Sequence, residues 1–322
     1  MSKKLKILVI RFSSIGDIIL TTPILRSLKS QLNCDIDFLT NRKYQNLLQS
    51  NPNIHDIYLL KDKSNDTITF LKDIEYDIII DLQNNFRSFK IRLGLKIKSF
   101  VVSKENIKRY ILIYFGVNLL NNHIVDRYFK TVESLKVYND NKGIDYTLSN
   151  VSKIKLETDK DYISWCIGGT HEAKKLSVNQ ISNVINKLNT DVVLIGGADE
   201  KKMAAEIIKN TMSKKVHSFC GEISIEESAF LIKKSRLFLT NDTGMMHIAS
   251  AFDSPIISFW GCTKPSLGFS AYMPNKNSEN IIIELSKKPC SKHGQYCRFQ
   301  SKGCIKDIDH TTIYKAITRL IK

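Results

Sequence analysis

The chain has 322 residues, of which 43% are hydrophobic, with only 6 prolines and 14 glycines. This composition fits an ordinary globular protein with a sizeable core, and the length favours two domains. No apolar run is long enough for a transmembrane helix, which needs about 18 residues. The basic start of the chain leads into a strand pattern and not into the layout of a signal peptide, so we expect a cytoplasmic protein.

The formal net charge is +16, and two segments concentrate it. Residues 86–130 hold ten Lys and Arg against two acids, and residues 285–306 hold six against none. Surface lysines keep many proteins soluble, but solubility alone does not explain two segments nearly free of acids. Such segments imply an anionic partner: nucleic acid, an anionic membrane or a phosphorylated or carboxylated substrate. Signatures of RNA recognition and aromatic stacking strings are absent, so we expect no nucleic acid.

The first half of the chain alternates strand-like and helix-like segments. An apolar run at 7–10 predicts a strand buried on both faces, followed by a polar turn at 13–16 and a helix over 18–31. Further strands are predicted at 35–40, 56–60, 76–82 and 98–102. Further helices are predicted at 42–49, 67–74, 107–120 and from about 123 to 136. This alternation predicts a parallel sheet with helices on both faces.

A polar, turn-rich segment at 139–160 is typical of an interdomain linker, and after it the alternation restarts. Strands are predicted at 162–167, 191–195, 215–218, 236–240 and 255–260. Helices are predicted at 178–188, 199–211, 225–233, 243–251 and 311–321. We therefore expect two α/β domains, residues 1–150 and residues 151–322.

The turn after the first strand carries Ser14, Gly16 and Asp17. Asp17 opens the helix, where backbone N–H groups stabilise a carboxylate, and parallel sheets bind ligands at this edge. An acid here can also do no more than complement the helix dipole. The whole string from Ser13 to Pro23 resembles the N-terminal signature of glycosyltransferase family 9, the heptosyltransferases that build the lipopolysaccharide core. The resemblance implies that Asp17 is the general base and that Ser14 and Gly16 contact the acceptor. The G-x-G-x-x-G of dinucleotide enzymes is absent.

A second motif follows the strand predicted at 236–240. Asp242, Thr243 and Gly244 begin a helix, where free backbone N–H groups can hold a phosphate, and His247 lies one turn further on. Taken alone, His247 is more often a packed core histidine. The string resembles the nucleotide-sugar motif D-[TS]-G-x-x-H-x-A-A of the same family, with Ser250 in place of one Ala. The resemblance implies that these four residues bind the donor.

Two looser matches concern the donor. Thr170 precedes a lysine that the resemblance places on the donor diphosphate, and either Lys174 or Lys175 fits that position because Leu176-Ser177 replaces the expected Trp-Pro. We assign the role to Lys174, a cation that would stabilise the departing diphosphate, although a solvated loop lysine is the alternative. Asp199 and Glu200 could bind the nucleoside by analogy with the family, or Asp199 could merely cap the next helix.

Two further matches concern the acceptor. The segment from Asp81 to Ser88 resembles the family turn D-L-Q-x-x-x-[RK]-S, and the segment from His123 to Arg127 its helix H-x-V-[DE]-R. We expect Arg87 and Arg127 to contact an anionic acceptor; a structural ion pair is an equal alternative for Arg127.

Seven cysteines in a chain without a secretory layout favour reduced thiols. Cys290, His293, Cys297 and Cys304 provide enough ligands for one tetrahedral zinc or iron site. Their spacing is not C-x2-C, so a loop of reduced thiols is the preferred interpretation and the metal site the alternative.

Together these observations predict a GT-B fold, with two Rossmann-like domains facing across a cleft. The resemblance to glycosyltransferase family 9 implies an inverting glycosyltransferase that moves heptose from ADP-heptose to an anionic lipopolysaccharide core acceptor. It should need no cofactor and, without a D-x-D motif, no metal in the transfer. The alternatives are transfer of another activated sugar in surface-polysaccharide synthesis, or a sugar-nucleotide-binding protein without catalysis. Residues 104–120 join Lys104, Lys108 and Arg109 to an apolar aromatic run, which predicts reversible contact with the anionic inner membrane.

Overall fold

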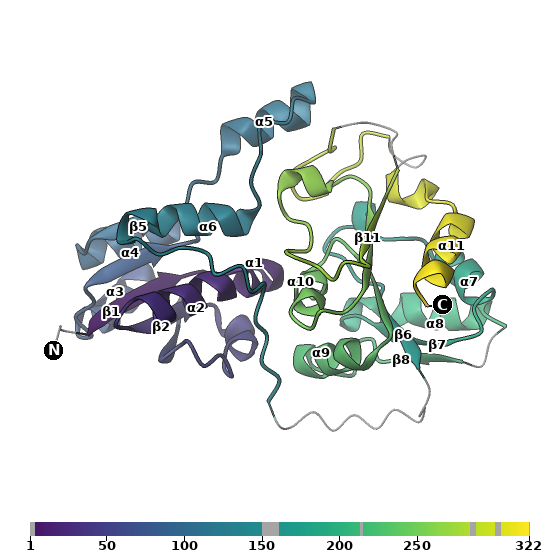
Figure 1. Cartoon of the computed structure of the whole chain (residues 1–322), viewed down its shortest axis with the longest axis horizontal. Helices are drawn as coiled ribbons and strands as arrows, with labels where there is room; N and C mark the ends of the chain where they lie inside the picture. The colour runs from purple at the N-terminus through teal and green to yellow at the C-terminus, as the bar shows by residue number, and fades with distance from the viewer. Residues whose placement is uncertain (1–3, 150–160, 213–214, 284–287, 300–303, 322) are drawn as a thin grey trace. The chain divides into compact units, whose positions relative to one another are not determined.

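The computed structural model describes residues 4–149, 161–212, 215–283, 288–299 and 304–321. The chain forms two compact units (Figure 1). The first unit comprises residues 1–105 and 122–147, and the second comprises residues 106–121 and 148–322. The segment 106–121 therefore leaves the first unit and packs with the second. Each unit has its own parallel sheet and its own hydrophobic core.

The first unit is built on a five-stranded parallel sheet in the order β3-β2-β1-β4-β5. Its strands are β1 Leu5–Ile10, β2 Cys34–Thr40, β3 Asp56–Leu59, β4 Ile78–Asp81 and β5 Ser99–Val101. All five were predicted. In the central strand β1, residues 7–10 are buried because neighbouring strands and helices cover it. Ile10 at its end is level with Leu39 of β2 and Asp81 of β4. The strands β2 and β3 lie on one side of β1, and the later strands β4 and β5 lie on the other. The carboxyl ends of β1 and β4 therefore form a topological switch point.

The helical segments of the first unit connect these strands. They are α1 Ile15–Ile19, α2 Thr22–Gln31, η1 Arg42–Leu47, α3 Ser64–Lys72, α4 Phe86–Leu95, α6 Ile124–Val132 and η2 Glu133–Leu135. The single helix predicted over 18–31 is wrong, because α1 ends before α2 begins. Pro23 has no N–H for the Ile19 carbonyl, and the Thr22 hydroxyl donates to that carbonyl instead, at 2.9 Å.

Helix α4 was not predicted. Its start is a capping box, in which the Asn85 side chain accepts from the Ser88 N–H at 2.9 Å and the Ser88 hydroxyl accepts from the Asn85 N–H at 3.0 Å. Lys96, in the left-handed conformation, ends it. The large number of exposed basic and aromatic side chains obscured the helical period. The helix fixes the turn that follows β4.

The second unit is built on a six-stranded parallel sheet in the order β11-β10-β9-β6-β7-β8. Its strands are β6 Tyr162–Cys166, β7 Asp191–Ile195, β8 Val216–Ser218, β9 Leu237–Asn241, β10 Ile256–Trp260 and β11 Glu279–Ile282. The short edge strand β11 was not predicted. In the core, Trp165 and Phe259 are fully buried with ring centroids 6.0 Å apart. The switch point of this sheet lies between β6 and β9.

Helices cover both faces of the second sheet (Figure 1). Helices α7, α8 and α11 gather on one face, and α9 and α10 lie on the other. The helical segments are α5 Asn106–Phe115, η3 Glu172–Lys174, α7 Val178–Ile185, η4 Ala198–Glu200, α8 Lys201–Asn210, α9 Ile225–Lys234, α10 Gly244–Ser250, η5 Pro265–Leu267, η7 Cys304–Asp307 and α11 His310–Leu320. Helix α5 was predicted to reach residue 120 but ends at Phe115, because Gly116 turns the chain with a φ of +77°. Within the described ranges, no helix has the length and apolar character to cross a membrane.

Candidate functional site

The first candidate site lies at the carboxyl end of β1. Ser14 is the N-cap of α1, and Asp17 lies in its first turn, where the capping box turns the carboxylate back toward the strand. The Asp17 carboxylate accepts from the Ser14 N–H at 3.2 Å and from the Ser14 hydroxyl at 3.1 Å. Gly16 is buried inside the same turn. The structure thus brings Ser14, Gly16 and Asp17 together as the sequence predicts.

Arg11 orients Asp17. Its guanidinium pairs with Asp17 Oδ2 at 2.8 Å and also donates to the carbonyls of Ser13 and Leu82, at 2.7 and 2.6 Å. Burial by itself would raise the pKa of Asp17, but Arg11 and the Ser14 hydrogen bonds outweigh it and hold that pKa below its ordinary value. Asp17 is therefore ionised at neutral pH. Within the described residues, every recorded contact of this carboxylate uses Oδ2, which leaves Oδ1 to accept a hydroxyl.

Arg127 and Arg87 differ in exposure. Arg127 on α6 is buried, with its Nε 3.9 Å from Glu105 Oε2. Burial lowers the pKa of Arg127, and the carboxylates of Glu105 and Asp17 are among the charges that oppose this shift. Arg127 is therefore within electrostatic reach of Asp17, and its ion-pair alternative has a physical basis. Arg87 is exposed at the start of α4.

The second candidate site lies at the switch point of the second sheet. Lys174 follows β6, and its ammonium group donates to Asp242 Oδ2, which follows β9, at 2.6 Å. The Thr263 hydroxyl, after β10, donates to the same oxygen at 2.8 Å. Both side chains of the ion pair are mostly buried, with 12% and 15% exposed. Three adjacent strands thus deliver a cation, a carboxylate and a hydroxyl to one point.

The neighbouring lysine has different partners. Lys175 pairs with Glu200 and Glu172, each at 3.0 Å. Burial by itself would lower the pKa of Lys175, but the hydrogen bonds to these two carboxylates outweigh it and raise that pKa above its ordinary value. Glu200 is buried after β7 and accepts from the Gly197 N–H at 2.9 Å. Asp199 and Thr170 are exposed, and neither side chain caps the helix that follows it.

The turn between β9 and α10 holds the remaining residues that the sequence predicts to bind the donor. Thr243 is the N-cap of α10, its hydroxyl oxygen 3.0 Å from that of Thr240, and Gly244 is the first helical residue. His247 is buried within α10. Asn241, the last residue of β9, donates to the carbonyl of Gly168, two residues after β6, at 2.9 Å. The turn that carries Asp242 is therefore fixed against the segment that leads to Lys174.

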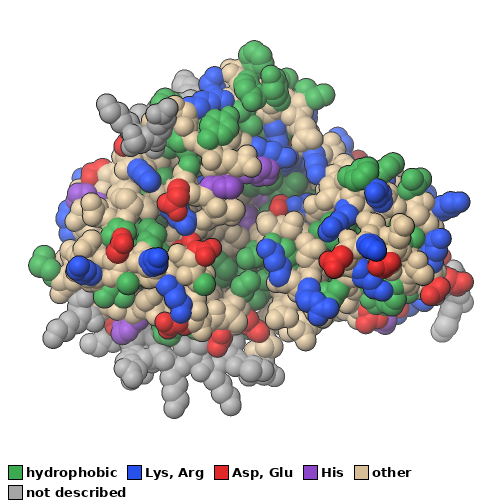
Figure 2. Space-filling view, turned by 180° about the vertical axis from the view of Figure 1, so that it is seen from behind, with side chains coloured by type: hydrophobic (Ala, Val, Ile, Leu, Met, Phe, Trp, Pro, Cys, Tyr) green, Lys and Arg blue, Asp and Glu red, His purple; other side chains and the backbone are tan. Residues whose placement is uncertain are grey.

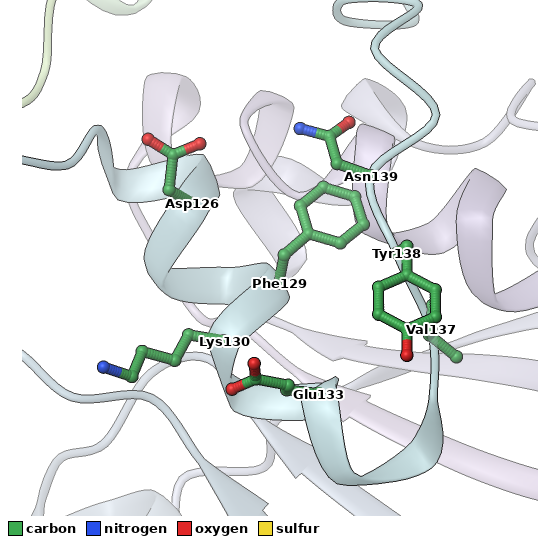
Figure 3. Close-up of a pocket in the computed structure, with 7 residues that line it drawn as sticks. All are labelled: Asp126, Phe129, Lys130, Glu133, Val137, Tyr138 and Asn139. Carbon is green, nitrogen blue, oxygen red and sulfur yellow. The ribbon is translucent and has the colours of Figure 1, made fainter.

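A pocket elsewhere in the first unit is separate from these residues. It has a volume of about 340 Å³ and lies between α6 and the segment after η2 (Figure 3). It is lined by Asp126, Phe129, Lys130, Glu133, Val137, Tyr138 and Asn139. None of the predicted site residues lines it. The Asp126 carboxylate accepts from the backbone N–H of His123 and so caps α6.

The predicted metal ligands need one correction. The four clustered side chains are Cys262, Cys290, Cys297 and Cys304, with sulfur atoms all within 4.8 Å of one another. His293, which sequence analysis included, is exposed and is not a member of the cluster. Cys262 was missed because it lies 28 residues before Cys290 in the sequence. Arg11 and Thr263 were not predicted as site residues, although each lies just beyond the end of a predicted strand.

The chain resembles characterised proteins over almost its whole length. The sequence model described as "Glycosyltransferase family 9 (heptosyltransferase)" matches residues 67–300. Lipopolysaccharide heptosyltransferase 1 of Campylobacter coli is 25% identical, over 98% of this chain and 99% of its own.

Solved structures share the architecture. The glycosyl transferase family 9 from Veillonella parvula has a TM-score of 0.78 at 20% identity, over 98% of this chain and 97% of that chain. The Escherichia coli ADP-heptose lps heptosyltransferase II has a TM-score of 0.74 at 20% identity, over 98% of each chain. The fold is therefore the GT-B fold, as the sequence predicts.

Proposed function

Because the chain belongs to glycosyltransferase family 9 and is therefore a glycosyltransferase, we propose that it transfers heptose from ADP-heptose to an inner-core sugar of lipopolysaccharide. The names of its relatives support both the sugar and the acceptor, and one solved relative is an ADP-heptose lps heptosyltransferase. Transfer of another nucleotide-activated sugar is the second candidate. The shared fold alone does not decide which nucleotide-activated sugar is the donor, because contacts to the sugar itself distinguish one donor from another.

The observation that carries the proposal is the Asp17 carboxylate, held ionised at a sheet switch point. In the proposed reaction an acceptor hydroxyl oxygen attacks the anomeric carbon, and the bond from that carbon to the diphosphate oxygen breaks. Asp17 Oδ1 takes the hydroxyl proton, and ADP leaves with the electron pair. Attack from the face opposite the leaving group inverts the anomeric centre.

Arg11 has two opposing effects in this scheme. It fixes the carboxylate in one orientation and keeps it ionised, which favours productive alignment. It also lowers the proton affinity of Asp17, which weakens the carboxylate as a base. A base of this kind suits a reaction in which the hydroxyl loses its proton late, after the bond to the leaving group has begun to break.

Lys174 would stabilise the departing diphosphate. Its ammonium group is held by Asp242, so an incoming diphosphate would share or replace that carboxylate. The preorganised cation then costs little reorganisation when negative charge develops. Glu200 and Asp199 would bind the nucleoside. The exposed Arg87 would contact an anionic acceptor, whereas the buried Arg127 would act on it only through its charge. We also propose that the enzyme contacts the anionic membrane in which its acceptor is embedded.

Product analysis with a panel of ADP- and GDP-sugars and a core-oligosaccharide acceptor tests the donor. Replacement of Asp17 by Asn tests the base. We expect Asp17→Asn to lower kcat by about 10²–10⁴-fold, because a general base contributes that much, and to leave the affinity for ADP unchanged.

Asp66→Asn is the matched control, since Asp66 is an exposed carboxylate in the first turn of α3. It should keep wild-type turnover. Wild-type turnover by Asp17→Asn would contradict the assignment of the base.

A further inference from the structure

Four cysteines of the second unit converge from separate stretches of chain. Cys262 lies two residues after β10, Cys290 and Cys297 follow β11, and Cys304 begins η7. Their sulfur atoms all lie within 4.8 Å of one another. Cys262, Cys290 and Cys304 are buried, and Cys297 is half-buried. The chain contains three other cysteines, and none of them joins this cluster.

The spacing of the sulfur atoms matches a tetrahedral thiolate site. A metal–sulfur bond of about 2.3 Å places the sulfur atoms of a regular tetrahedron about 3.8 Å apart. Cys290 Sγ and Cys304 Sγ are 3.9 Å apart, and Cys297 Sγ and Cys304 Sγ are 3.3 Å apart. These separations exceed the covalent sulfur–sulfur bond of about 2.05 Å. Four sulfur ligands in tetrahedral array favour zinc or iron.

The backbone around the cluster is built for close approach. A Cβ on Gly261 would lie 2.6 Å from the backbone nitrogen of Ile305 and 3.2 Å from the Cβ of Cys304. Only glycine therefore lets the segment after β10 contact η7 at this point. The Cys290 N–H donates to the Cys262 carbonyl at 2.8 Å, which joins the third segment to the other two. Contacts other than those between the sulfur atoms thus hold the four ligands together.

The charge near the cluster complements a metal thiolate. Four thiolates with one divalent ion carry a net charge of −2. Residues 285–306, which contain three of the cysteines, hold six Lys and Arg and no acid. Lys264 and Lys288 line the same small pocket as Cys290 and Cys304. A metal thiolate at this position would therefore provide an anionic partner for the basic segment 285–306.

The cluster is also connected to the Lys174–Asp242 ion pair. A Cβ on Gly294, between Cys290 and Cys297, would lie 2.6 Å from Cε of Lys174, so this loop packs directly on that side chain. Ala173 packs against the cysteines themselves. Thr263, which donates to Asp242, is the residue after Cys262. The cysteine loops thus support both partners of the Lys174–Asp242 ion pair.

We propose that Cys262, Cys290, Cys297 and Cys304 bind one thiophilic divalent metal ion, Zn²⁺ or Fe²⁺, and that this ion braces the loops that position Lys174 and Asp242. The ion replaces the thiol protons and is coordinatively saturated by the four sulfur atoms, so it has a structural role. The metal site itself is independent of the proposed function. Its effect on ADP binding, in contrast, rests on the proposed function.

Metal content tests the site directly. Protein purified under reducing conditions should retain about one zinc or iron ion per chain through exhaustive dialysis, measured by plasma mass spectrometry. After chelation and reconstitution with Co²⁺ alone, the wild type should show the visible absorption of tetrahedral cobalt thiolate. Cys297→Ser should lose both signals, and Cys220→Ser, a buried cysteine of the same unit outside the cluster, should keep them. Absence of metal and of the cobalt spectrum in the wild type, or recovery of these cysteines as disulfides, would overturn the site.

Calorimetry with ADP tests the bracing role. Chelation or Cys297→Ser should weaken ADP binding about fivefold or more, a usual size for coupling between two sites, and Zn²⁺ should restore it in the wild type only. An ADP affinity that is unchanged on metal removal would overturn the bracing role while leaving the metal measurements intact. Failure of the wild type to bind ADP at all, with metal present, would instead contradict the proposed donor.

Discussion

Lys174 and Lys175 are adjacent in sequence but have separate partners. Lys174 reaches across the switch point to Asp242, and Lys175 turns to Glu200 and Glu172. Backbone direction decides this, because η3 ends at Lys174 and the next residue is extended. A match to the family motif cannot decide which of the two lysines contacts the donor diphosphate. Their different carboxylate partners do distinguish them.

The role of Lys174 can be tested by its effect on the affinity for ADP. We expect Lys174→Ala to weaken ADP binding about 10–100-fold, because hydrogen bonds to charged groups contribute about 1.5–3 kcal/mol. Lys175→Ala is the matched control and should weaken binding less, since its ammonium group is shared by two carboxylates. Isothermal calorimetry of both variants with ADP measures the difference. A loss confined to Lys175→Ala would move the diphosphate contact by one residue.

At the scale of elements, the first part of the expected linker is bound to α2. Tyr138, just before this segment, exchanges two hydrogen bonds with Gln31. Within the segment, Asp140 forms a bidentate pair with Arg26, and Asp145 forms a further ion pair with it. The two Arg26–Asp140 bonds are 2.7 and 2.8 Å long. The polar composition of the segment predicts that it is exposed to solvent. The same polar side chains also form hydrogen bonds and ion pairs with α2, whose outer face is polar.

The contacts between α2 and residues 138–145 predict that the stability of the protein depends on pH. Arg26→Ala should lower the free energy of unfolding by about 1–3 kcal/mol at pH 7, because charge-assisted hydrogen bonds are lost. The Arg26 hydrogen bonds hold the pKa of Asp140 below its ordinary value. A lowered pKa gives stability that is complete above the unfolded value of about 3.9 and is lost as the pH falls below it.

Urea unfolding from pH 7 down to pH 3 measures this effect. The difference between the wild type and Arg26→Ala should shrink below about pH 4, as Asp140 becomes protonated. Arg42→Ala, at an exposed arginine of η1, should cost little at any pH. A difference that stays constant over the whole range would mean that packing of Arg26, and not its ion pair, supplies the stability.

At the scale of the whole molecule, charge and exposed apolar surface meet on α5. Figure 2 shows hydrophobic side chains gathered over α5 at the top of the view, with Lys and Arg side chains beside them. Ile107, Tyr110 and Tyr114 lie on one face of the helix and are 78%, 54% and 50% exposed. Leu112 and Ile113, on the other face, pack with Leu267. One expectation was wrong: Arg109 is buried against the Phe269 ring, at 4.9 Å, and does not face a membrane.

We expect weak, salt-sensitive attachment of the whole protein to anionic membrane. The net charge of +16 attracts an anionic surface, and each Lys or Arg near it contributes about 1 kcal/mol. Sedimentation with phosphatidylcholine vesicles, with and without phosphatidylglycerol, measures it. The double variant Ile107→Glu, Tyr114→Glu should bind less, whereas Met212→Glu, at a residue 90% exposed, should bind nearly as the wild type does. Equal binding to both vesicle types, or none at low salt, would contradict the membrane contact.

The sequence by itself determined the features that depend on neighbouring residues. The strand at 191–195 was predicted with both of its ends, and alternating apolar runs predicted every strand but the short β11. Asp17 was placed in the first turn of its helix, because a capping box acts over three residues. The motif of residues 13–23 is likewise continuous, so one stretch of sequence was enough to suggest the family that the comparisons then established.

Only the tertiary structure decided which distant residues meet. Arg11 contacts Leu82, Lys174 meets Asp242, and Cys262 joins Cys304, because strand order brings their loops to one sheet edge or to one cluster. Burial likewise separated Arg109 from the exposed residues of its own helix. Periodicity and spacing report only on local geometry. The pairings that set the pKa of Asp17, hold Lys174 and gather the four thiols depend on chain topology, which no single stretch of sequence contains.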